Sequence, residues 1–332
     1  MDNNENKREG LLLSVKDLEV TYETKDETVR AVNGVSFDLN YGETIGLVGE
    51  TGAGKTTIAK SIIGILPTPP AKVKNGRIEL DGQNLFELKE EQMRRIRGGR
   101  ISMVFQDPMT ALNPIKRIGW QIAEAIRYHE DVTKAQADEK AREILRMVGI
   151  SEDRFREYPH QFSGGMKQRV VLAIAVACSP DLLIADEPTS ALDVTIQAQV
   201  LEMIADLQKK KNSAMILITH DFGIVAKTCN KVAVVYAGEI IEYGDVFQIF
   251  DRPMHPYTSG LFAAIPKMTD DVDRLTPING APPDPTHLPK GCKFAPRCPH
   301  ATDKCRKEVP VFEMADGHQC KCFMYEGEAV NK

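Results

Sequence analysis

Short, almost wholly apolar runs recur along the chain and predict the strands of a β-sheet. They lack the polar residue at every second position that marks a strand with one face in water. This pattern is typical of parallel strands that are covered on both faces. The runs are Thr44–Val48, Ile101–Phe105, Leu182–Ala185, Met215–Ile218 and Val232–Tyr236.

Helical periodicity fills the stretches between these runs. Apolar residues three and four positions apart form stripes, which predict helices with one buried face. One stripe consists of Ala141, Ile144, Leu145 and Val148, and a second of Ile196, Val200, Ile204 and Leu207. Lys209–Lys211 end the second helix, where the helix dipole favours cations. The alternation of strands and helices predicts an α/β fold with a mostly parallel sheet.

The composition excludes several classes of protein. The 332 residues are 42% hydrophobic and 27% charged, which argues against disorder, collagen and coiled coil. A net charge of -5 argues against a protein that wraps nucleic acid, which needs an excess of Lys and Arg. The longest apolar run, Val170–Cys178, is less than half of the ~20 residues that cross a bilayer, and the polar first residues lack a signal-peptide core. We therefore expect a cytoplasmic protein.

The chain changes character near residue 250. Five of its seven cysteines follow Gly291, and eleven of its nineteen prolines lie from Pro253 onward. At ~150 residues per domain the chain holds about two domains, and we place them at residues 1–250 and 251–332. In a reducing cytosol, clustered cysteines indicate a metal site more than disulfides.

The cysteine spacing leaves the kind of metal site open. Four thiolates could hold tetrahedral zinc or an iron–sulfur cluster. Structural zinc sites favour cysteine pairs with two to four residues between them, whereas five residues separate Cys292 from Cys298 and six separate Cys298 from Cys305. Cys178 and Cys229 lie in apolar or helical surroundings and are interpreted as packing residues.

A glycine-rich loop follows the first apolar run and precedes a helix-compatible stretch, Thr56–Gly64. The loop residues Gly49, Glu50, Thr51, Gly52, Ala53, Gly54, Lys55 and Thr56 match the pattern G-x-x-x-x-G-K-[ST]. Its glycines let backbone N–H groups converge on phosphate oxygens. We expect Lys55 to supply a cation to the β- and γ-phosphates of a nucleotide and Thr56 a hydroxyl to Mg²⁺.

Two acidic residues end the apolar run Leu182–Ala185. Ligands of open α/β sheets bind at the carboxyl ends of strands, so Asp186 lies where it could hold Mg²⁺. Glu187, one residue further, is positioned to polarise an attacking water as a general base. An apolar strand followed by two carboxylates is common by itself, and the phosphate loop is what favours the nucleotide interpretation.

The segment Phe162–Arg169 begins a helix that we expect to run to about Cys178. Ser163 has N-cap chemistry, and Gly164 and Gly165 expose backbone N–H groups that could grip a phosphate. The segment resembles the LSGGQ signature of ATP-binding-cassette (ABC) ATPases, with Phe for Leu and Met for Gln. On this resemblance the chain is identified as an ABC ATPase subunit.

The resemblance implies further site residues and a dimeric mechanism. Gln106 resembles the glutamine that reaches Mg²⁺ and the attacking water, and His220 the switch histidine at the γ-phosphate. Ser190–Asp193 resemble the loop that communicates between two sites, which assigns Asp193 to the nucleotide. Tyr22 stands where the family places an aromatic ring under adenine, although an edge-strand packing role is as plausible, and Thr57 adjoins the phosphate loop. In this family two ATP molecules lie between two cassettes, each facing the partner's signature.

The remaining chain narrows the resemblance to the ATPases of peptide and nickel importers, first-subunit type. Arg252–Thr258 closely resemble RxxHPYT, which opens their C-terminal extension, and Gly291–Pro299 resemble a motif further along it. The resemblance covers residues 11 to 325 and implies a P-loop ABC cassette of mostly parallel sheet with antiparallel β and helical subdomains, the helical one at about 107–175. It also implies a small metal-binding extension with a [4Fe–4S] cluster on Cys292, Cys298, Cys305 and Cys322. Cys320 is then spare, and zinc is the alternative.

The expected partners are a second ABC ATPase subunit, two transmembrane permeases and, through them, an extracytoplasmic peptide-binding protein, with no nucleic acid. A homodimer is possible in isolation. The expected location is the cytoplasmic face of the membrane, and the cargo a dipeptide or oligopeptide, with nickel as the alternative. A soluble ABC protein of ribosomes or DNA usually carries two cassettes or a long coiled coil, and this sequence has neither. A metal- or redox-sensing module with a secondary ATPase is a third hypothesis.

Overall fold

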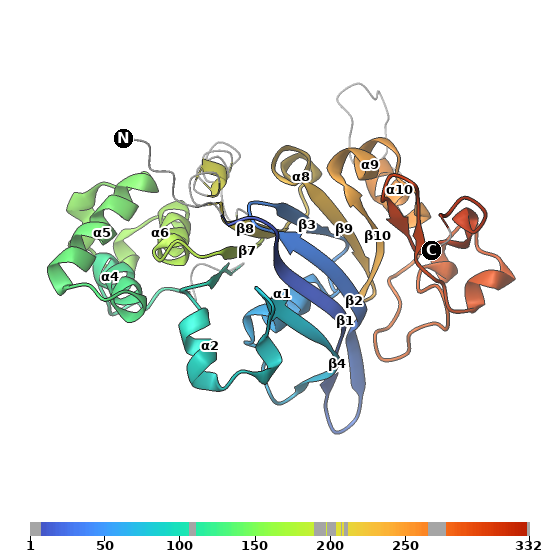
Figure 1. Ribbon diagram of the computed structural model, residues 1–332, viewed down its shortest axis with the longest axis horizontal. Coiled ribbons are helices and arrows are strands. Elements are labelled where there is room, and N and C mark those ends of the chain that lie inside the picture. Colours follow the sequence, from blue (N-terminus) through green and yellow to red (C-terminus); the bar gives the residue numbers. More distant parts are fainter. Residues whose placement is uncertain are drawn as a thin grey trace.

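The computed structural model describes residues 8–105, 111–188, 197, 204–206, 208, 212–264 and 277–330. Two β-sheets form the centre of the molecule. A group of helices lies at one end and the Cys- and Pro-rich segment at the other (Figure 1). Each apolar run that predicted a strand forms one, so the sequence pattern and the central architecture agree.

Among the described residues the larger sheet has eight strands, in the order β11-β12-β10-β9-β3-β8-β7-β6. They are β3 (Thr44–Val48), β6 (Ile101–Val104), β7 (Leu182–Asp186), β8 (Ala214–Ile218), β9 (Lys231–Tyr236), β10 (Glu239–Asp245), β11 (Phe312–Glu313) and β12 (Gln319–Cys320). The strands from β6 to β9 in this order pair in parallel, whereas β10, β11 and β12 pair antiparallel. The prediction of a mostly parallel core is confirmed.

Helices occupy the connections between the strands. They are α1 (Lys55–Ile63), α2 (Glu90–Ile96), α4 (Ile118–His129), α5 (Lys134–Met147), α6 (Gly164–Val176), α8 (Phe222–Thr228), α9 (Val246–Asp251) and α10 (Pro256–Ala263). The first predicted stripe is buried along α5 and its C-cap. Of the second stripe Ile204 is described and buried, while its other members and Lys209–Lys211 lie outside the described residues. Helix α6 ends at Val176, close to the predicted end.

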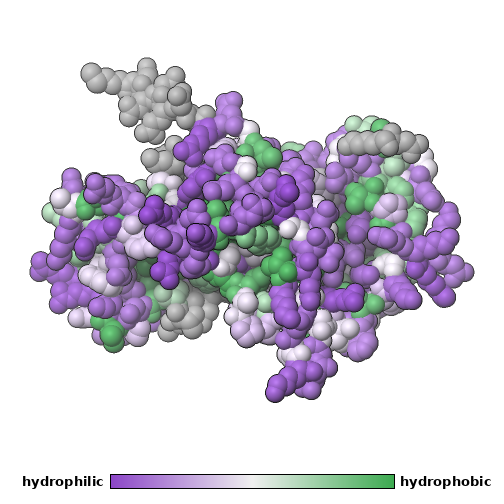
Figure 2. All heavy atoms as spheres, turned by 60° about the horizontal axis from the view of Figure 1, so that its bottom comes forward, coloured by the Kyte–Doolittle hydropathy of each residue, from purple (hydrophilic) through white to green (hydrophobic). Residues whose placement is uncertain are grey.

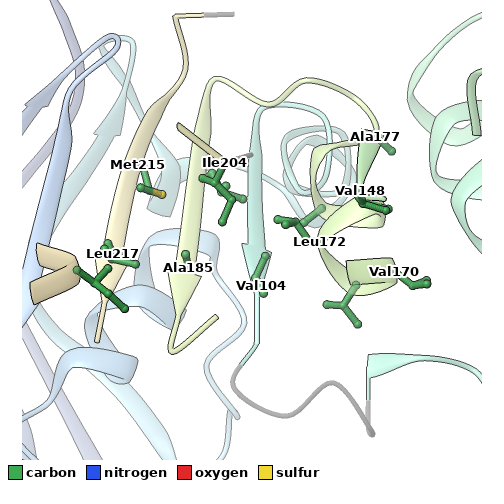
Figure 3. Packing of buried hydrophobic residues seen from close by; sticks show 14 of the residues in the cluster. Val104, Val148, Val170, Leu172, Ala177, Ala185, Ile204, Met215 and Leu217 are labelled. Atoms are coloured by element: carbon green, nitrogen blue, oxygen red, sulfur yellow. The ribbon is translucent and has the colours of Figure 1, made fainter. Parts of the chain in front are cut away.

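Side chains of the parallel strands alternate between two apolar clusters, one on each face of the sheet. On β7, Leu183 and Ala185 belong to one cluster, and Leu182 and Ile184 belong to the other. Helix α6 packs on the first cluster, where strand and helix side chains interlock (Figure 3). Helix α1 packs on the second. Burial on both faces explains the continuous apolar runs, because each buried Leu or Ile contributes roughly 1.5–3 kcal/mol to stability.

The smaller sheet covers α1 on the side away from the larger sheet. Its strands are β1 (Leu11–Glu23), β2 (Thr28–Asn40), β4 (Ala71–Leu80) and β5 (Gln83–Asn84), in the order β2-β1-β4-β5, and all pairings are antiparallel. Its buried side chains join the cluster that contains the apolar face of α1. The long strands β1 and β2 carry alternating buried and exposed positions, as expected for a sheet with one solvated face.

The C-terminal segment is built onto the larger sheet. Strand β12 pairs with β10, and β11 pairs with β12, so the sheet continues past residue 250. The rest of this segment consists of α10, short 3-10 helices and turns. Buried apolar residues are sparse in it: Met254, Tyr257, Phe294, Val309, Phe312 and Cys320.

No helix within the described ranges has both the length and the apolar character to cross a bilayer. The face in Figure 2 is predominantly polar, and its apolar side chains lie in small, separated groups. Charged residues of α2 form exposed pairs such as Arg94–Glu90, so this helix has a solvated face.

Candidate functional site

Three parallel strands end at one edge of the larger sheet and bring the predicted groups together. β3 ends at Val48 and leads into the glycine-rich loop, β7 ends at Asp186, and β8 ends at Ile218, two residues before His220. β8 lies between β3 and β7. The carboxyl ends of parallel strands meet at one edge, so residues more than 100 positions apart in sequence share this site.

Close backbone approaches fix the glycine-rich loop. Gly49 has φ +148° and Gly54 has φ +104°, in the region that side chains rarely adopt. A Cβ on Gly49 would lie 2.1 Å from the carbonyl oxygen of Val235. The N–H of Gly238 donates to the carbonyl of Ala53 at 2.9 Å, which ties the loop to the β9–β10 turn. The loop therefore presents the N-terminus of α1, a ready site for phosphate.

Lys55 is folded against its own loop. Its ammonium group donates to the carbonyl oxygens of Gly49 at 2.6 Å and Glu50 at 2.9 Å, and the residue is buried. Burial lowers the pKa of Lys55, and the carboxylates of Glu187 and Asp186 oppose this shift. A cation thus stands between the loop and the acidic strand end, where the sequence predicted it.

Thr56 and Asp186, the two described residues predicted to hold Mg²⁺, lie together. The Thr56 hydroxyl lies close enough to Asp186 to lower the pKa of its carboxyl group, which is buried at the end of β7. Burial raises the pKa of Asp186, whereas the Thr56 hydroxyl and the charge of Lys55 lower it. A carboxylate and a hydroxyl side by side supply oxygen ligands of the kind that Mg²⁺ takes.

Glu187 and His220 form a pair across neighbouring strand ends. Nε2 of His220 lies 2.8 Å from Oε1 of Glu187. The backbone of Glu187 has φ +48°, unusual for a residue with a side chain, and its N–H donates to the carbonyl of Ile218 at 2.8 Å. Such strain persists where the surroundings fix it, and it clusters at functional sites. The half-exposed histidine orients the glutamate at the open edge of the sheet.

Tyr22 reaches the same neighbourhood from β1. Its hydroxyl lies 3.2 Å from the hydroxyl oxygen of Thr57 in the first turn of α1. Tyr22 is partly buried and contacts the helix that follows the phosphate loop, although 26 residues lie between it and Gly49. Thr51 and Gly52, in the middle of the loop, are exposed.

The signature segment lies on the other side of the sheet. Ser163 caps α6, with its hydroxyl accepting from the N–H of Met166 at 3.3 Å, and both Ser163 and Gly164 are exposed. Helix α6 packs on the opposite face of the sheet from α1. Gly165, the third predicted residue, is the second residue of α6. The exposed end of α6 is thus available to a second molecule.

Gln168 connects the signature helix to the acidic strand end, and the sequence analysis missed it. Its side-chain amide donates to the carbonyl oxygen of Pro188, next to Glu187, at 2.6 Å, and the side chain is buried. The only sequence signal was a polar residue at an apolar stripe position of α6. Gln106 and Asp193 lie outside the described residues.

Two residues of the C-terminal segment also reach the phosphate loop unpredicted. The Tyr257 hydroxyl and the Arg297 guanidinium both contact Glu50. They belong to the two C-terminal motifs singled out in the sequence, but the separations of 207 and 247 residues hide the contact.

A cavity of about 190 Å³ in the C-terminal segment gathers the four cysteines predicted as ligands. Cys292, Cys298, Cys305 and Cys322 line it, whereas Cys320 is buried in β12. Burial raises the pKa of the Cys292 thiol to about 11.

The four thiols line one cavity, but they are not arranged around a common centre. Within the described residues, no three His, Cys, Asp or Glu side chains are placed to hold a single metal ion. A zinc ion needs four ligands at ~2–2.3 Å, whereas iron–sulfur clusters are larger groups held by four cysteine thiolates.

Two protein-family models match the chain. The "ABC transporter" model matches residues 32–190, and the "Oligopeptide/dipeptide transporter, C-terminal region" model matches residues 241–305. The first match spans the phosphate loop, the signature and the acidic strand end, and the second contains the C-terminal motifs and three of the clustered cysteines.

Curated relatives match over nearly their whole length. The "Oligopeptide transport ATP-binding protein AppD" of Bacillus subtilis (strain 168) is 46% identical over 97% of this chain and 99% of its own. The "Dipeptide transport ATP-binding protein DppD" of the same organism is 48% identical over 96% of both chains. DppD of Escherichia coli (strain K12) is 46% identical over 94% of this chain and 96% of its own.

Solved structures share the fold of the first part of the chain. The ATP-binding cassette MJ0796, solved as a dimer in a post-hydrolysis state with ADP and Pi, superposes with a TM-score of 0.65 at 24% identity, over 71% of this chain and 99% of its own. The cbiO1 subunit from Clostridium perfringens, part of the ABC transporter complex cbiONQ, gives a TM-score of 0.62 at 27% identity, over 73% and 91%. The ABC cassette fold is thereby shown.

Proposed function

The chain belongs to the family of ABC-transporter ATP-binding subunits that includes the oligopeptide and dipeptide transport proteins, and from this premise we propose that it powers import of di- or oligopeptides across the cytoplasmic membrane. As a family member it is an ATPase that converts ATP and water to ADP and phosphate. The observation that carries the proposal is the 46–48% identity to peptide transport subunits over nearly the full length, C-terminal segment included.

ATP binding rests on the loop between β3 and α1. The residues from Gly49 to Thr57 surround the α1 N-terminus, whose N–H groups suit phosphate oxygens, and the ammonium of Lys55 leaves its own loop carbonyls for the β- and γ-phosphates. Tyr22 offers a ring beside the loop for the adenine. Mg²⁺, when bound, neutralises charge on the β- and γ-phosphates. Thr56 and Asp186 would hold it, together with Gln106.

Hydrolysis depends on the Glu187–His220 pair. Glu187 accepts a proton from the attacking water, and its 2.8 Å contact with His220 keeps the carboxylate aimed at the open edge where the γ-phosphate lies. The half-exposed imidazole of His220 would also contact that phosphate from the end of β8. Gln168 supports this arrangement from behind by fixing the carbonyl of Pro188.

The complete site needs a second cassette. The exposed cap of α6, with Ser163, Gly164 and Gly165, supplies N–H groups that would face a partner's γ-phosphate, while Asp193 would communicate between the two sites. The placement of α1 and α6 on opposite faces of the sheet supports this division of labour. The partner is a second ABC ATPase subunit in the transporter, or a second copy of this chain in isolation.

Coupling to transport assigns the remaining partners. Two transmembrane permeases would dock on the helical subdomain, at about residues 107–175, and an extracytoplasmic binding protein would deliver the peptide through them. The subunit then lies at the cytoplasmic face of the membrane without entering it. The chain divides into the cassette, residues 1–250, and the extension, residues 251–332.

In the extension, Cys292, Cys298, Cys305 and Cys322 would hold a [4Fe–4S] cluster. Their shared cavity supports this set and leaves Cys320 as a packing residue. The cluster would cross-link segments that have few apolar contacts of their own. A stoichiometric zinc content in purified protein would identify the alternative.

Uptake into proteoliposomes tests the function. The chain is reconstituted with its partner ATPase, two permeases and binding protein, and uptake of labelled dipeptides, longer peptides and Ni²⁺ is compared. We expect peptide uptake that requires ATP and is lost with Lys55→Ala, while a control at an exposed lysine outside the helical subdomain, Lys25→Ala, keeps it. Nickel uptake without peptide uptake, or peptide uptake that does not need ATP, would refute the proposal.

A further inference from the structure

An arginine of the extension, Arg297, forms an ion pair with Glu50, the second residue of the phosphate loop. Nη1 of Arg297 lies 2.7 Å from Oε2 of Glu50, and Nη2 lies 3.0 Å from Oε1, so the two groups form a two-pronged ion pair. The Arg297 side chain is 5% exposed and that of Glu50 28%. An ion pair this well shielded is stronger and less sensitive to salt than an exposed one.

Every N–H of the Arg297 guanidinium has an acceptor. Besides the two carboxylate oxygens, Nη1 donates to the Tyr236 hydroxyl at 3.2 Å, Nε to the carbonyl of Asn279 at 3.0 Å and Nη2 to the carbonyl of Ile278 at 3.4 Å. A guanidinium has five N–H donors. Its position is therefore fixed from the extension and from β9 at once, and a lysine, with three donors on a flexible stem, cannot reproduce it.

A second contact holds the backbone of the same loop residue. The N–H of Glu50 donates to the hydroxyl of Tyr257 in α10 at 2.8 Å. The Tyr257 ring is fully buried and packs against the rings of Tyr236 and Phe294, with centroids 4.5 and 5.4 Å away. Both the side chain and the backbone of Glu50 are thus bound to groups that the extension carries or orders.

Glu50 in turn fixes the groups that would meet the phosphates. Its carbonyl oxygen accepts from the ammonium of Lys55 at 2.9 Å and from the N–H of Ala53 at 3.2 Å. A displacement of Glu50 would therefore move the catalytic cation and the turn of the loop together. A chain of direct contacts runs from Arg297 through Glu50 to Lys55.

We propose that Arg297 is a positioning residue for ATP binding, through which the folded extension holds the phosphate loop in its nucleotide-accepting shape. Arg297 closes the 3-10 helix Ala295–Arg297 and directly precedes Cys298, whose thiol lines the cysteine cavity. A change in the structure of the cysteine cavity would therefore move Arg297 and, through Glu50, the phosphate loop. The inference rests on the proposed function, because it assigns the extension a role in the same nucleotide site.

Nucleotide affinity of the full-length chain tests the proposal. A fluorescent non-hydrolysable ATP analogue with Mg²⁺ is titrated into wild-type, Arg297→Gln, Arg297→Lys and Glu50→Gln protein. We expect each variant to bind on the order of tenfold more weakly, with Arg297→Lys the least affected, a size typical of coupling between sites. For Arg297→Gln and Arg297→Lys, kcat at saturating ATP should fall by a smaller factor than the affinity does, because Arg297 touches none of the reacting groups.

The control is Arg252→Gln, which removes an exposed arginine of the same extension that pairs with Asp316. Its affinity should match wild type. The double variant Arg297→Gln/Glu50→Gln should bind no more weakly than either single variant, since both remove one connection. The proposal would be overturned if the double variant lost affinity by the product of the two single losses, or if Arg297→Gln bound the analogue as tightly as wild type.

Folding and function are separated by two further readouts. If Arg297→Gln fails to fold, Glu50→Gln decides alone, because it leaves the extension's own residues intact: weaker binding supports the proposal and unchanged binding overturns it. If wild-type protein binds no analogue, the proposed ATPase function fails. If wild type binds and all variants bind equally, the positioning role alone is refuted.

Discussion

The cassette and the extension are stabilised by different means, although residues of both meet at the phosphate loop. The parallel strands of the cassette bury apolar side chains on both faces. The residues proposed to bind the nucleotide come directly after the ends of these strands. The extension buries few apolar residues and is attached by two short strands and by polar contacts. Its clearest anchor is Glu242 of β10.

The Glu242 carboxylate is buried and fully engaged. It accepts from the N–H groups of Met254 at 2.7 Å and His255 at 2.8 Å, and from Nε2 of His318 at 2.9 Å. Both Glu242 and His318 side chains are inaccessible to solvent. A region held this way gains specificity from a few irreplaceable groups, whereas the apolar core of the cassette tolerates many similar side chains.

The largest effect is expected in the cassette. Glu187→Gln should leave ATP binding intact and reduce turnover by roughly 10²–10⁴-fold, because an amide cannot accept the proton of the attacking water. Steady-state phosphate release measures it. Glu91→Gln, on the exposed face of α2, should hydrolyse ATP as wild type does. Unchanged turnover in Glu187→Gln would show that another group is the base.

The cysteine cavity gives the next largest contrast. Cys322→Ser should lose bound iron and sulfide by at least about tenfold, since it removes one of four ligands, whereas Cys320→Ala should retain them. Metal analysis and visible absorbance of anaerobically purified protein measure both. Loss in Cys320→Ala with retention in Cys322→Ser would reverse the assignment, and zinc in place of iron would exclude the cluster.

The anchor of the extension should matter for stability. Glu242→Gln puts an amide where three donors need a carboxylate, and we expect it to lower the free energy of unfolding by about 2–4 kcal/mol. Denaturant unfolding measures the loss, and limited proteolysis should show that cleavage starts in the extension. Glu326→Gln, which breaks the exposed pair with Lys304, should cost under about 1 kcal/mol. Equal effects of the two variants would contradict the contrast.

The smallest expected effect comes from a comparison of two N-cap residues, one of which is also proposed to act in the ATP site. Ser163→Ala and Thr133→Ala each remove an N-cap, of α6 and α5, and each should cost about 1 kcal/mol of stability. Only Ser163→Ala should also reduce ATP hydrolysis, because only that cap is expected to face a partner's phosphate. Thermal unfolding and hydrolysis assays compare them, and parallel hydrolysis losses would remove the functional role of Ser163.

Apolar patterning made the cassette predictable from sequence. The run Thr44–Val48 is β3 residue for residue, and the loop, Asp186 and the Ser163 cap lie where their motifs placed them. These features depend on residues near one another in the chain or on the rule that parallel strands end at one edge. The 2.8 Å contact pairs Glu187, whose role was inferred from its place after a strand, with His220, whose role only the family resemblance implied.

Contacts between distant polar residues could not be predicted in this way. Nothing in the spacing of Arg297 or Tyr257 indicates that both reach Glu50, because no periodicity relates residues more than 200 positions apart. The contact between Glu242 and His318, which are 76 positions apart, is not indicated by any periodicity either. The cysteine spacing identified a cluster of thiols but could not show that they line one cavity while Cys320 turns into the sheet.

The central claim is that ATP is clamped between two cassettes and cut by water that Glu187 activates. Sedimentation of the full-length Glu187→Gln chain with labelled ATP and Mg²⁺ tests it most directly. The account predicts that the label travels with a particle of twice the mass of the chain, which dissociates when ATP is withheld. A well-folded chain that carries no label, or that stays monomeric with ATP bound, would contradict it.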